Sequence, residues 1–551
     1  MTAAPTARRL TIHELRRDVI GEGSLATTPF GARRLTYADY IASGRPLRSV
    51  ETALARSVLP LYANSHTEDS ATGAHVTELT ERAREYIKRC LGGSGTHKLI
   101  FAGTGATGAL KRLQEILGVS VPPRLREQVL AVLPPAGRFV VFVGPYEHHS
   151  NEVSWRESLA EVVRIPLAAD GTLDLAALER ALTDPRYLGR PRLGSFSAAS
   201  NVTGLKTDVR AVARLLHSHD AKAAFDYAAA GPYVGVDVRE TAPGASDGLD
   251  AVVLSPHKFL GGPGSPGLLL MEAGLYHLSA PTTAGGGTVT YVSPATHRFV
   301  SDVESREDAG TPGILQKLRA AMAFRVKERV GVDVIEEREA RFIGRALERL
   351  CANPKVEVLG NVTAPRLAVV SFLLRPNGRY LHPRFVVRLL SDLFGVQGRA
   401  GCSCAGPYGH DLLGIGDEES LRYLAQVEAG YEGLKPGWSR LSFHYLLDDA
   451  EFEFLLAAVE FLAEEGDAFL PLYDFDWESG AWRHGGEREA PAAGFAPEEW
   501  EAVPETRGGR EEEYAAYLAE AKRLAAELRA APPPARDRGT RADTRLAFFQ
   551  Y

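Results

Sequence analysis

The chain has 551 residues, and its 63 Lys+Arg against 70 Asp+Glu give a formal net charge of −7. Hydrophobic residues make up 45% and charged residues 24%, as in ordinary soluble globular proteins. This composition excludes disorder throughout, collagen-like repeats and a basic nucleic-acid-binding coat. Four cysteines cannot form a disulfide framework in so long a chain and favour a reducing compartment. With no signal-like apolar run and no stretch near the ~20 apolar residues that span a bilayer, we expect a cytoplasmic protein that contacts neither membrane nor nucleic acid.

Short apolar or β-branched runs alternate with helix-like stretches between about residues 35 and 270, after a short predicted helix at Thr11–Val19. The predicted strands are Lys98–Ala102, Arg138–Gly144, Ala160–Pro166, Gly194–Ala198, Ala221–Phe225 and Ala251–Ser255. The predicted helices include Val76–Leu91, Leu173–Leu182 and Val209–His219. The alternation favours βαβ units, with a parallel sheet covered by helices on both faces. Ligands bind at the carboxyl ends of the strands in such sheets, so functional residues are expected there.

The rest of the chain changes character twice. A glycine-rich stretch, Pro281–Gly313, is expected to have little regular structure. Two long helical patterns, Leu315–Val330 and Val332–Ala352, then lead into a second, smaller α/β domain. Beyond it, Phe469–Ala502 has no clear period, whereas Arg510–Ala530 predicts an amphipathic helix. We interpret that helix as packed on the body of the protein or on a second subunit.

A lysine and an aspartate follow two of the predicted strands. Lys258 lies in Ser255-Pro256-His257-Lys258, directly after a buried run, and Asp226 ends the run Ala221–Phe225. A desolvated lysine amine forms Schiff bases with pyridoxal phosphate (PLP), and that cofactor needs a carboxylate to keep its ring nitrogen protonated. Each residue alone has an ordinary explanation, a surface lysine or a helix N-cap. The pair at neighbouring strand ends predicts a cofactor site.

Two further motifs follow strands. The turn Gly103–Gly108 opens a helix, and free N–H groups at a helix start bind phosphate; the turn matches neither a Walker loop nor a dinucleotide fingerprint. His148 could stack on a flat cofactor ring or transfer protons. His148 and His149 could instead bind a metal, although no cluster of cysteines or carboxylates completes such a site. We therefore predict no metal site here.

The order of these motifs resembles that of the class V aminotransferase superfamily. The motifs are GATG, EHHSN, SNVTG (Ser200–Gly204), FDYAA, SPHK, GGGT (Gly285–Thr288) and REDAGTP (Arg306–Pro312), with Tyr37-Ala38-Asp39 at the start. Within the superfamily, Arg399–Pro407 (RAGCSCAGP) is similar to the active-site loop of group II cysteine desulfurases and selenocysteine lyases. The resemblance implies an α/β protein of PLP-dependent transferase fold type I, with a mainly parallel seven-stranded sheet in its large domain. It implies four segments: an arm (1–34), the PLP-binding large domain (35–312), a smaller α/β C-terminal domain (313–465) and an extension (466–551).

The resemblance also implies how the cofactor is held. Lys258 would bind PLP covalently, Asp226 would pair with its ring nitrogen, and His148 would stack on the ring. The cofactor phosphate would be held by residues at two strand ends: Gly105, Ala106, Thr107, Ser255 and His257. Because the family shares its sites across a homodimer, Gly287 and Thr288 would reach the phosphate of the other subunit.

For the substrate, a small amino acid, the resemblance implies a carboxylate site. Arg440 would clamp the α-carboxylate, since its planar fork binds a carboxylate bidentately, and Arg399 would lie beside it. Asn201 would bind the ring hydroxyl or the same carboxylate. Cys404 falls on the desulfurase nucleophile and would take sulfur from L-cysteine as a persulfide, releasing L-alanine. The resemblance also implies a protein that accepts this sulfur as a partner.

Three departures keep another reading open. Ala229 stands where the family usually has Gln, Cys402 stands where His is common, and about twenty extra residues separate Cys404 from Arg440. The alternative is another class V activity, as an aminotransferase, epimerase or C–S lyase in specialised metabolism, with Cys404 non-catalytic. A cofactor-free scaffold and a metal module at Cys402, Cys404 and His410 are weaker readings, because the cofactor residues are intact and the spacing matches no zinc signature.

Overall fold

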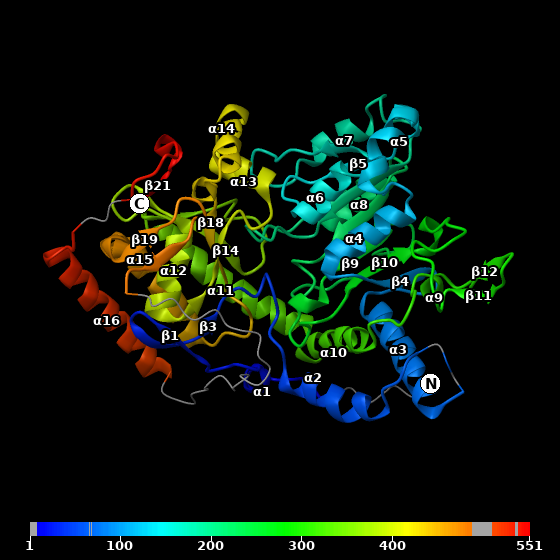
Figure 1. Ribbon diagram of the computed structural model, residues 1–551, viewed down its shortest axis with the longest axis horizontal. Coiled ribbons are helices and arrows are strands. Elements are labelled where there is room, and N and C mark those ends of the chain that lie inside the picture. The colour runs from blue at the N-terminus through cyan, green and yellow to red at the C-terminus, as the bar shows by residue number, and fades with distance from the viewer. Residues whose placement is uncertain (1–7, 66, 68, 487–509, 535–537) are drawn as a thin grey trace.

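The computed structural model describes residues 8–65, 67, 69–486, 510–534 and 538–551. A seven-stranded sheet, here the large sheet, has the order β4-β10-β9-β8-β7-β5-β6 (Figure 1). Its strands are β4 (His97–Ala102), β5 (Val140–Val143), β6 (Glu161–Arg164), β7 (Arg192–Ser197), β8 (Lys222–Asp226), β9 (Ala251–Leu254) and β10 (Gly267–Glu272). Strand β10 runs antiparallel to both of its neighbours, and the other six strands all run in the same direction. The predicted mainly parallel seven-stranded sheet is confirmed.

Helices cover both faces of the large sheet, because successive residues of each strand point to opposite sides. Val140 and Phe142 of β5 pack in the cluster that includes α3 (Ala71–Cys90). Val141 and Val143 pack in the cluster on the other face. The first face also carries α7 (Leu175–Leu182), α8 (Val209–His217) and α10 (Ile314–Val330), and the second α4 (Gly105–Ile116) and α6 (His149–Arg156). The central strands β5, β7 and β9 are thus buried throughout, whereas the edge strand β6 is not.

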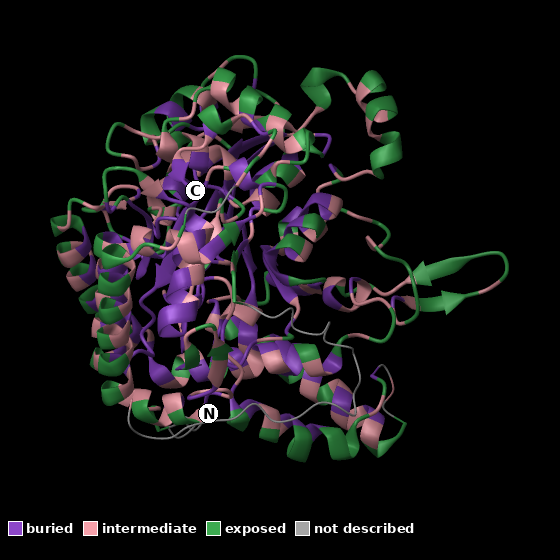
Figure 2. Ribbon diagram, turned by 60° about the vertical axis from the view of Figure 1, so that its left-hand side comes forward, coloured by how far each residue is buried: buried purple, intermediate pink, exposed green. Residues whose placement is uncertain are grey.

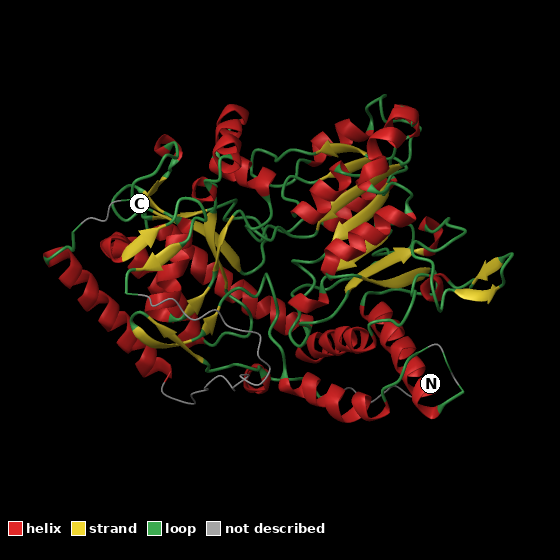
Figure 3. Ribbon diagram, viewed as in Figure 1, coloured by secondary structure: helices red, strands yellow, loops and turns green. Residues whose placement is uncertain are grey.

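A four-stranded antiparallel sheet, here the small sheet, lies in the other half of the molecule (Figures 1 and 3). Its order is β13 (Val356–Val358), β14 (Val369–Leu374), β18 (Trp438–Ser442) and β17 (Arg399–Gly401). Helices α11 (Val332–Ala352), α12 (Pro383–Phe394) and α15 (Asp449–Glu465) share its apolar core. The change from α10 to α11 falls at Gly331, whose φ of +93° suits glycine.

The two ends of the described chain pack on this half. The hairpin of β1 (Leu25–Thr28) and β2 (Gly31–Arg34) lies against α12, and α16 (Arg510–Ala530) lies against α12 and α15. Tyr514 of α16 stacks on Phe454, with ring centroids 3.9 Å apart. Arg33 and Arg34 form ion pairs of 2.6 Å with Glu520 and Glu513. The end segments are therefore joined to each other as well as to the core.

The remaining helices and strand pairs are short. The helices are α1 (Ile12–Asp18), α2 (Arg48–Ala53), α5 (Arg126–Val132), α13 (Gly406–Leu413) and α14 (Asp417–Glu428). The strand pairs are β3 (Thr36–Tyr37) with β16 (Val396–Gln397), β15 (Tyr380–Leu381) with β21 (Phe549–Gln550), and β19 (Tyr473–Phe475) with β20 (Trp482–His484). No helix among the described residues is both long and apolar enough to cross a bilayer.

The expectation of little regular structure in Pro281–Gly313 was wrong in part. The segment forms a hairpin, β11 (Val289–Val292) with β12 (His297–Phe299), that projects from the body with mostly exposed residues (Figure 2). A short helix, α9 (Val303–Arg306), follows it. The glycines of this segment, at positions 285–287, 310 and 313, lie before and after these elements and not within them. The glycine content of the whole segment therefore gave no indication of a strand or helix.

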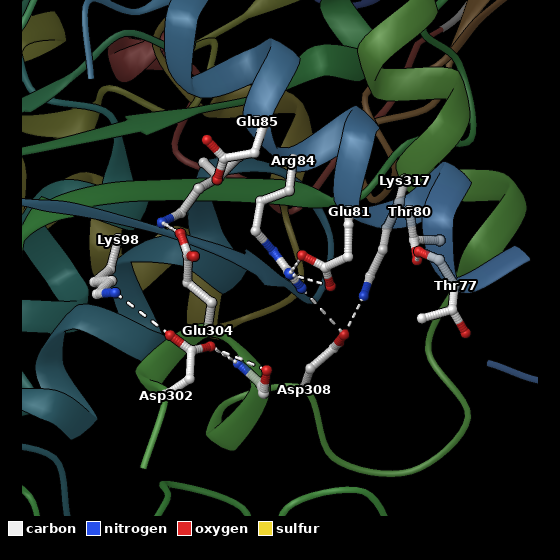
Figure 4. Close-up of polar contacts among 12 residues, drawn as sticks. Thr77, Thr80, Glu81, Arg84, Glu85, Lys98, Asp302, Glu304, Asp308 and Lys317 are labelled. Carbon is white, nitrogen blue, oxygen red and sulfur yellow. Dashed lines mark hydrogen bonds and ion pairs between the residues drawn. The ribbon is translucent and has the colours of Figure 1, made fainter. Parts of the chain in front are cut away.

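Buried ion pairs tie α9 and the residues after it to α3 (Figure 4). Lys88 of α3 lies 3.1 Å from the carboxylate of Glu304, which also accepts a hydrogen bond from the Leu99 N–H. Asp308 pairs with both Arg84 and Lys317. Because breaking a buried ion pair leaves an uncompensated charge, these contacts fix the segment that leads away from Gly287 and Thr288.

Candidate active site

A cavity of about 250 Å³ opens between the carboxyl ends of the large-sheet strands and a loop that follows β17 of the small sheet. Strand ends supply Asp226, Lys258 and His148 to its lining, and the other half supplies Arg440 and Cys404. The structure therefore brings together His148 and Arg440, which are 292 positions apart in the chain, at the sheet edge where α/β proteins bind ligands.

Lys258 and Asp226 lie at the ends of neighbouring parallel strands. Asp226 is the last residue of β8 and is 5% exposed, and Lys258 ends the short turn after β9. Burial lowers the pKa of Lys258 to about 8, although the charge of Asp226 opposes this shift. Burial also raises the pKa of Asp226, against a 2.7 Å hydrogen bond from the Ala228 N–H and the charge of Lys258. A cationic ring nitrogen beside Asp226 would supply the positive charge that favours its ionised form.

The start of α4 forms a cradle for an anion. Gly105 has a φ of +58°, and a Cβ there would lie 2.7 Å from His257 Cε1 and 2.9 Å from Ser255 Oγ. The Ala106 N–H donates to Ser255 Oγ over 2.8 Å. Thr107 Oγ1 lies 2.7 Å from Ser150 Oγ, and the side chain of the N-cap residue, Thr104, makes no capping hydrogen bond. Polar groups and the N-terminal dipole converge here, so the cradle fits the phosphate of PLP.

His148 borders the cavity as the N-cap of α6, and its Nδ1 accepts a 3.1 Å hydrogen bond from the Ser150 N–H. Burial lowers the pKa of His148 to about 4, so its ring is neutral near pH 7. A neutral, flat ring at this wall suits stacking on an aromatic cofactor. The EHHSN motif after the predicted strand Arg138–Gly144 predicts this position for His148.

Glu147, one residue earlier, was not among the predicted site residues. Its buried carboxylate accepts hydrogen bonds from the Ser197 N–H (2.8 Å), Ser197 Oγ (2.6 Å) and Asn151 Nδ2 (2.6 Å). Burial raises the pKa of Glu147 to about 7. These bonds fasten the loop before α6 to the end of β7, and so they fix the position of His148. The signal that could have identified Glu147 is its position directly before His148 and His149 in the sequence.

Arg440 and Arg399 are register partners on β18 and β17, and both bind Asp39. Arg440 Nη2 lies 2.9 Å from Asp39 Oδ1, and Arg399 Nε lies 2.9 Å from Asp39 Oδ2. Burial lowers the pKa of Arg440, and Asp39 opposes the shift. Asp39 was noticed only as part of the opening motif, and its contact with the arginines was missed. Two arginines and one aspartate leave a net positive charge for a substrate carboxylate.

Asn201 reaches the cavity from the loop after β7. Its Nδ2 donates a 2.7 Å hydrogen bond to the Ser403 carbonyl, and its backbone carbonyl accepts one from Arg440 Nη1 at 2.9 Å. Its Oδ1 is buried, with no protein hydrogen-bond partner among the described residues. A buried polar atom without a partner in the cavity wall is suited to bind a ligand.

Cys404 lies on a strained loop. Its φ is +58° and that of Ser403 is +51°, in the left-handed region that residues with side chains seldom adopt. Cys404 is exposed and lines the cavity; Cys402 is exposed but does not line it. All four cysteines are free. Across the residues that the structure describes, no group of three or more His, Cys, Asp or Glu could hold a metal ion.

Thr288 lies outside this cavity in its own chain. It is buried, and its Oγ1 donates a 2.7 Å hydrogen bond to the Gly285 carbonyl. Its predicted contact with the phosphate in a second subunit remains a prediction.

Comparison with known proteins agrees with this geometry. The sequence model of the aminotransferase class-V family matches residues 36–446. The chain is 27% identical over 394 residues to a probable cysteine desulfurase of Staphylococcus aureus, which covers 71% of this chain and 88% of the relative. It is 26% identical over 439 residues to another from Streptomyces coelicolor, covering 78% and 92%.

Solved structures show the same fold. An apo cysteine desulfurase from Thermococcus onnurineus matches with a TM-score of 0.65 at 23% identity, over 84% of this chain and all of that one. A cysteine desulfurase from Escherichia coli matches with a TM-score of 0.61 at 21% identity, over 82% and 98%. Fold and site thus define a PLP-dependent enzyme of fold type I. The chain belongs to the class V aminotransferase family.

Proposed function

We propose that this protein is a cysteine desulfurase-type enzyme that converts L-cysteine to L-alanine and takes the sulfur onto Cys404. One observation carries the proposal: an exposed thiol, Cys404, opens into the same cavity as Lys258 and Arg440. The curated relatives named as probable cysteine desulfurases support it.

Binding of the substrate would begin at the arginines. Arg440 is buried and Arg399 is half exposed, and Asp39 holds both guanidinium groups in place. An α-carboxylate at this site would meet remaining N–H donors of the two arginines. The orphan Oδ1 of Asn201 supplies a further polar contact. These groups orient the amino acid so that its amino group faces Lys258.

Proton transfer would fall to Lys258. PLP, held by Lys258, Asp226 and the cradle at Gly105, supplies an electron sink for the bond broken at the substrate Cα. With a pKa of about 8, the Lys258 amine can take up and return a proton near neutral pH. Asp226 stabilises the positive charge that this chemistry needs at its side of the cavity, and His148 excludes water from the facing wall.

The sulfur transfer balances without an added oxidant. The C–S bond of L-cysteine breaks, and an S–S bond forms between that sulfur and Cys404 Sγ. The electron pair of the broken bond stays with carbon, which gains a proton and becomes the methyl group of L-alanine. The products are L-alanine and a Cys404 persulfide, which a thiol of a small molecule or protein acceptor would then reduce.

The alternative remains an aminotransferase, epimerase or C–S lyase of the same family. Ala229 lines the cavity where the family usually has Gln, so one side of the cofactor ring lacks an amide partner. A different hydrogen-bond pattern there changes the electronic properties of the ring.

The test uses purified holoenzyme with L-cysteine and a thiol reductant, with sulfide and alanine as readouts. Cys404→Ala should lose sulfide release by at least about 10²-fold, as expected when a nucleophile is removed, while keeping its cofactor absorbance. Cys402→Ala, two residues away, is the matched control and should stay within about twofold of wild type. Sulfide release by Cys404→Ala at the wild-type rate would overturn the proposal. Amino-group transfer to a 2-oxo acid would then support the aminotransferase alternative.

We also propose a homodimer in which Thr288 of the partner subunit completes the phosphate site, and a cytoplasmic location. Buried ion pairs fix the segment after Thr288, as a shared site requires. The free cysteines suit a reducing compartment. Light scattering of the holoenzyme should give twice the chain mass, and Thr288→Ala should weaken cofactor binding without dissociating the dimer.

A further inference from the structure

His149 contacts the Cys404 loop on both sides of Ala405. Its backbone N–H donates a 2.8 Å hydrogen bond to the Cys404 carbonyl. Its ring Nε2 accepts a 2.9 Å hydrogen bond from the Gly406 N–H. The ring is not part of the cavity lining, although His148 beside it is. The second histidine of the pair therefore faces the loop, while the first faces the cofactor site.

The loop needs such contacts because its backbone is strained. Ser403 and Cys404 both have positive φ, a conformation that persists in residues with side chains only where the surroundings impose it. The Ser403 carbonyl is held by Asn201 Nδ2, and the Cys404 carbonyl by the His149 N–H. Both donors belong to the large-sheet half, so the loop is fixed relative to the wall that carries Lys258.

The ring of His149 also replaces a helix cap. Gly406 is the first residue of α13, and its N–H has no partner within the helix. The residue before it, Ala405, has no side-chain oxygen that could accept a hydrogen bond. His149 Nε2 supplies the missing acceptor from another helix. The start of α13 is thereby docked on the start of α6.

We infer that His149 is a positioning residue for Cys404: by binding the chain at Cys404 and Gly406, it holds the thiol at the distance and angle needed to meet the substrate sulfur. The inference rests on the proposed function, in which Cys404 accepts sulfur. Neither cofactor binding nor metal binding explains His149, the second residue of the histidine pair, and positioning of the loop gives it a role.

Two variants test the ring contact. His149→Ala removes the acceptor for the Gly406 N–H, whereas His149→Gln offers an amide oxygen in its place. Tyr408→Phe is the matched control, because it removes another contact between α13 and the large-sheet half, the 3.1 Å bond of Tyr408 to Thr203, without touching the loop. The readouts are the rate of persulfide formation on Cys404, amide hydrogen exchange of residues 404–410, and the change in cofactor absorbance when L-cysteine binds.

In His149→Ala we expect persulfide formation to slow, and amide exchange at 404–410 to accelerate, by about threefold to tenfold, the effect of one lost hydrogen bond. The absorbance change on binding should keep its rate, because it precedes the step at Cys404. His149→Gln should recover most of both losses, and Tyr408→Phe should keep the wild-type persulfide rate within about twofold.

The outcomes separate two failures. Wild-type enzyme that forms no persulfide would overturn the proposed function. Wild-type enzyme that does form it, with His149→Ala equal to wild type in rate and exchange, would overturn the role of His149 alone. The same holds if His149→Gln is as slow as His149→Ala, or if Tyr408→Phe slows the reaction equally, since the effect would then be general destabilisation of α13.

Discussion

The two walls of the cavity are built in different ways. One wall carries Asp226 and Lys258 at the ends of β8 and β9, whose strands are buried on both faces. The other is the loop at 402–405, with two residues at positive φ and hydrogen bonds from Asn201 and His149. The core fixes the first wall, whereas a few polar contacts fix the second. Substitutions in the first wall should therefore change the chemistry, and substitutions around the second should change the position of the thiol.

The largest effect should come from the strand-end wall. Asp226→Asn removes the charge that faces the cofactor ring, so we expect kcat to fall by about 10²–10³-fold, as when one preorganised electrostatic group is lost. The fold should be unaffected, because the amide keeps the shape of the side chain. Steady-state sulfide release and the visible spectrum measure this. Asp184→Asn, whose carboxylate pairs with Arg186 and does not line the cavity, is the control. An Asp226→Asn enzyme of wild-type rate would contradict the role.

An effect of intermediate size is expected at Arg399 and Arg440, which Asp39 holds in place. Asp39→Asn weakens two charge-assisted contacts, each of which contributes about 1.5–3 kcal/mol. We expect KM for L-cysteine to rise by about tenfold to a hundredfold, with a smaller change in kcat, because the arginines bind the carboxylate in substrate and transition state alike. A fall in kcat with an unchanged KM would argue against a binding role.

The cradle at Gly105 tests the fit of the cofactor phosphate. Gly105→Ala places a Cβ 2.7 Å from His257 Cε1 at a φ of +58°. The left-handed conformation alone costs alanine about 1–2 kcal/mol, so PLP affinity should weaken by about fivefold to thirtyfold. Titration of apoenzyme with PLP measures it. Gly118→Ala, also at positive φ but with open space around it, controls for backbone strain away from the site.

The smallest effect concerns stability at the opposite end of the large sheet. The hydrogen bond to Asp250 raises the pKa of His217. The resulting stabilisation is complete below the unfolded-state pKa of about 6.5 and is lost as pH rises through the higher folded-state pKa. His217→Gln should therefore be less stable than wild type at pH 5.5 by at most about 1 kcal/mol, and the gap should shrink by pH 9. Urea denaturation at the two pH values measures it, with exposed His297→Gln as control. A gap that grows with pH would contradict the sign.

The sequence predicted the first wall better than the second, for a physical reason. Asp226, Lys258 and His148 each follow an apolar run, and parallel strands bring their carboxyl ends to one edge. The pairing of Asp39 with Arg440 spans 401 positions, and the contact of His149 with Gly406 spans 257. No local pattern encodes such contacts, and the positive φ of Cys404 cannot be read from residues that are not glycine. The β11–β12 hairpin was not predicted, because the glycines around it make the whole segment resemble an irregular loop.

The most direct test of the central claim is to find which amine carries the cofactor. Purified holoenzyme is reduced with borohydride, which fixes a Schiff base as a stable bond, and is then digested and mapped by mass spectrometry. We predict the pyridoxyl mass on Lys258, and its absence from a Lys258→Ala enzyme that is also colourless. Label on another lysine, or a coloured Lys258→Ala enzyme with the wild-type spectrum, would contradict the cofactor site described here.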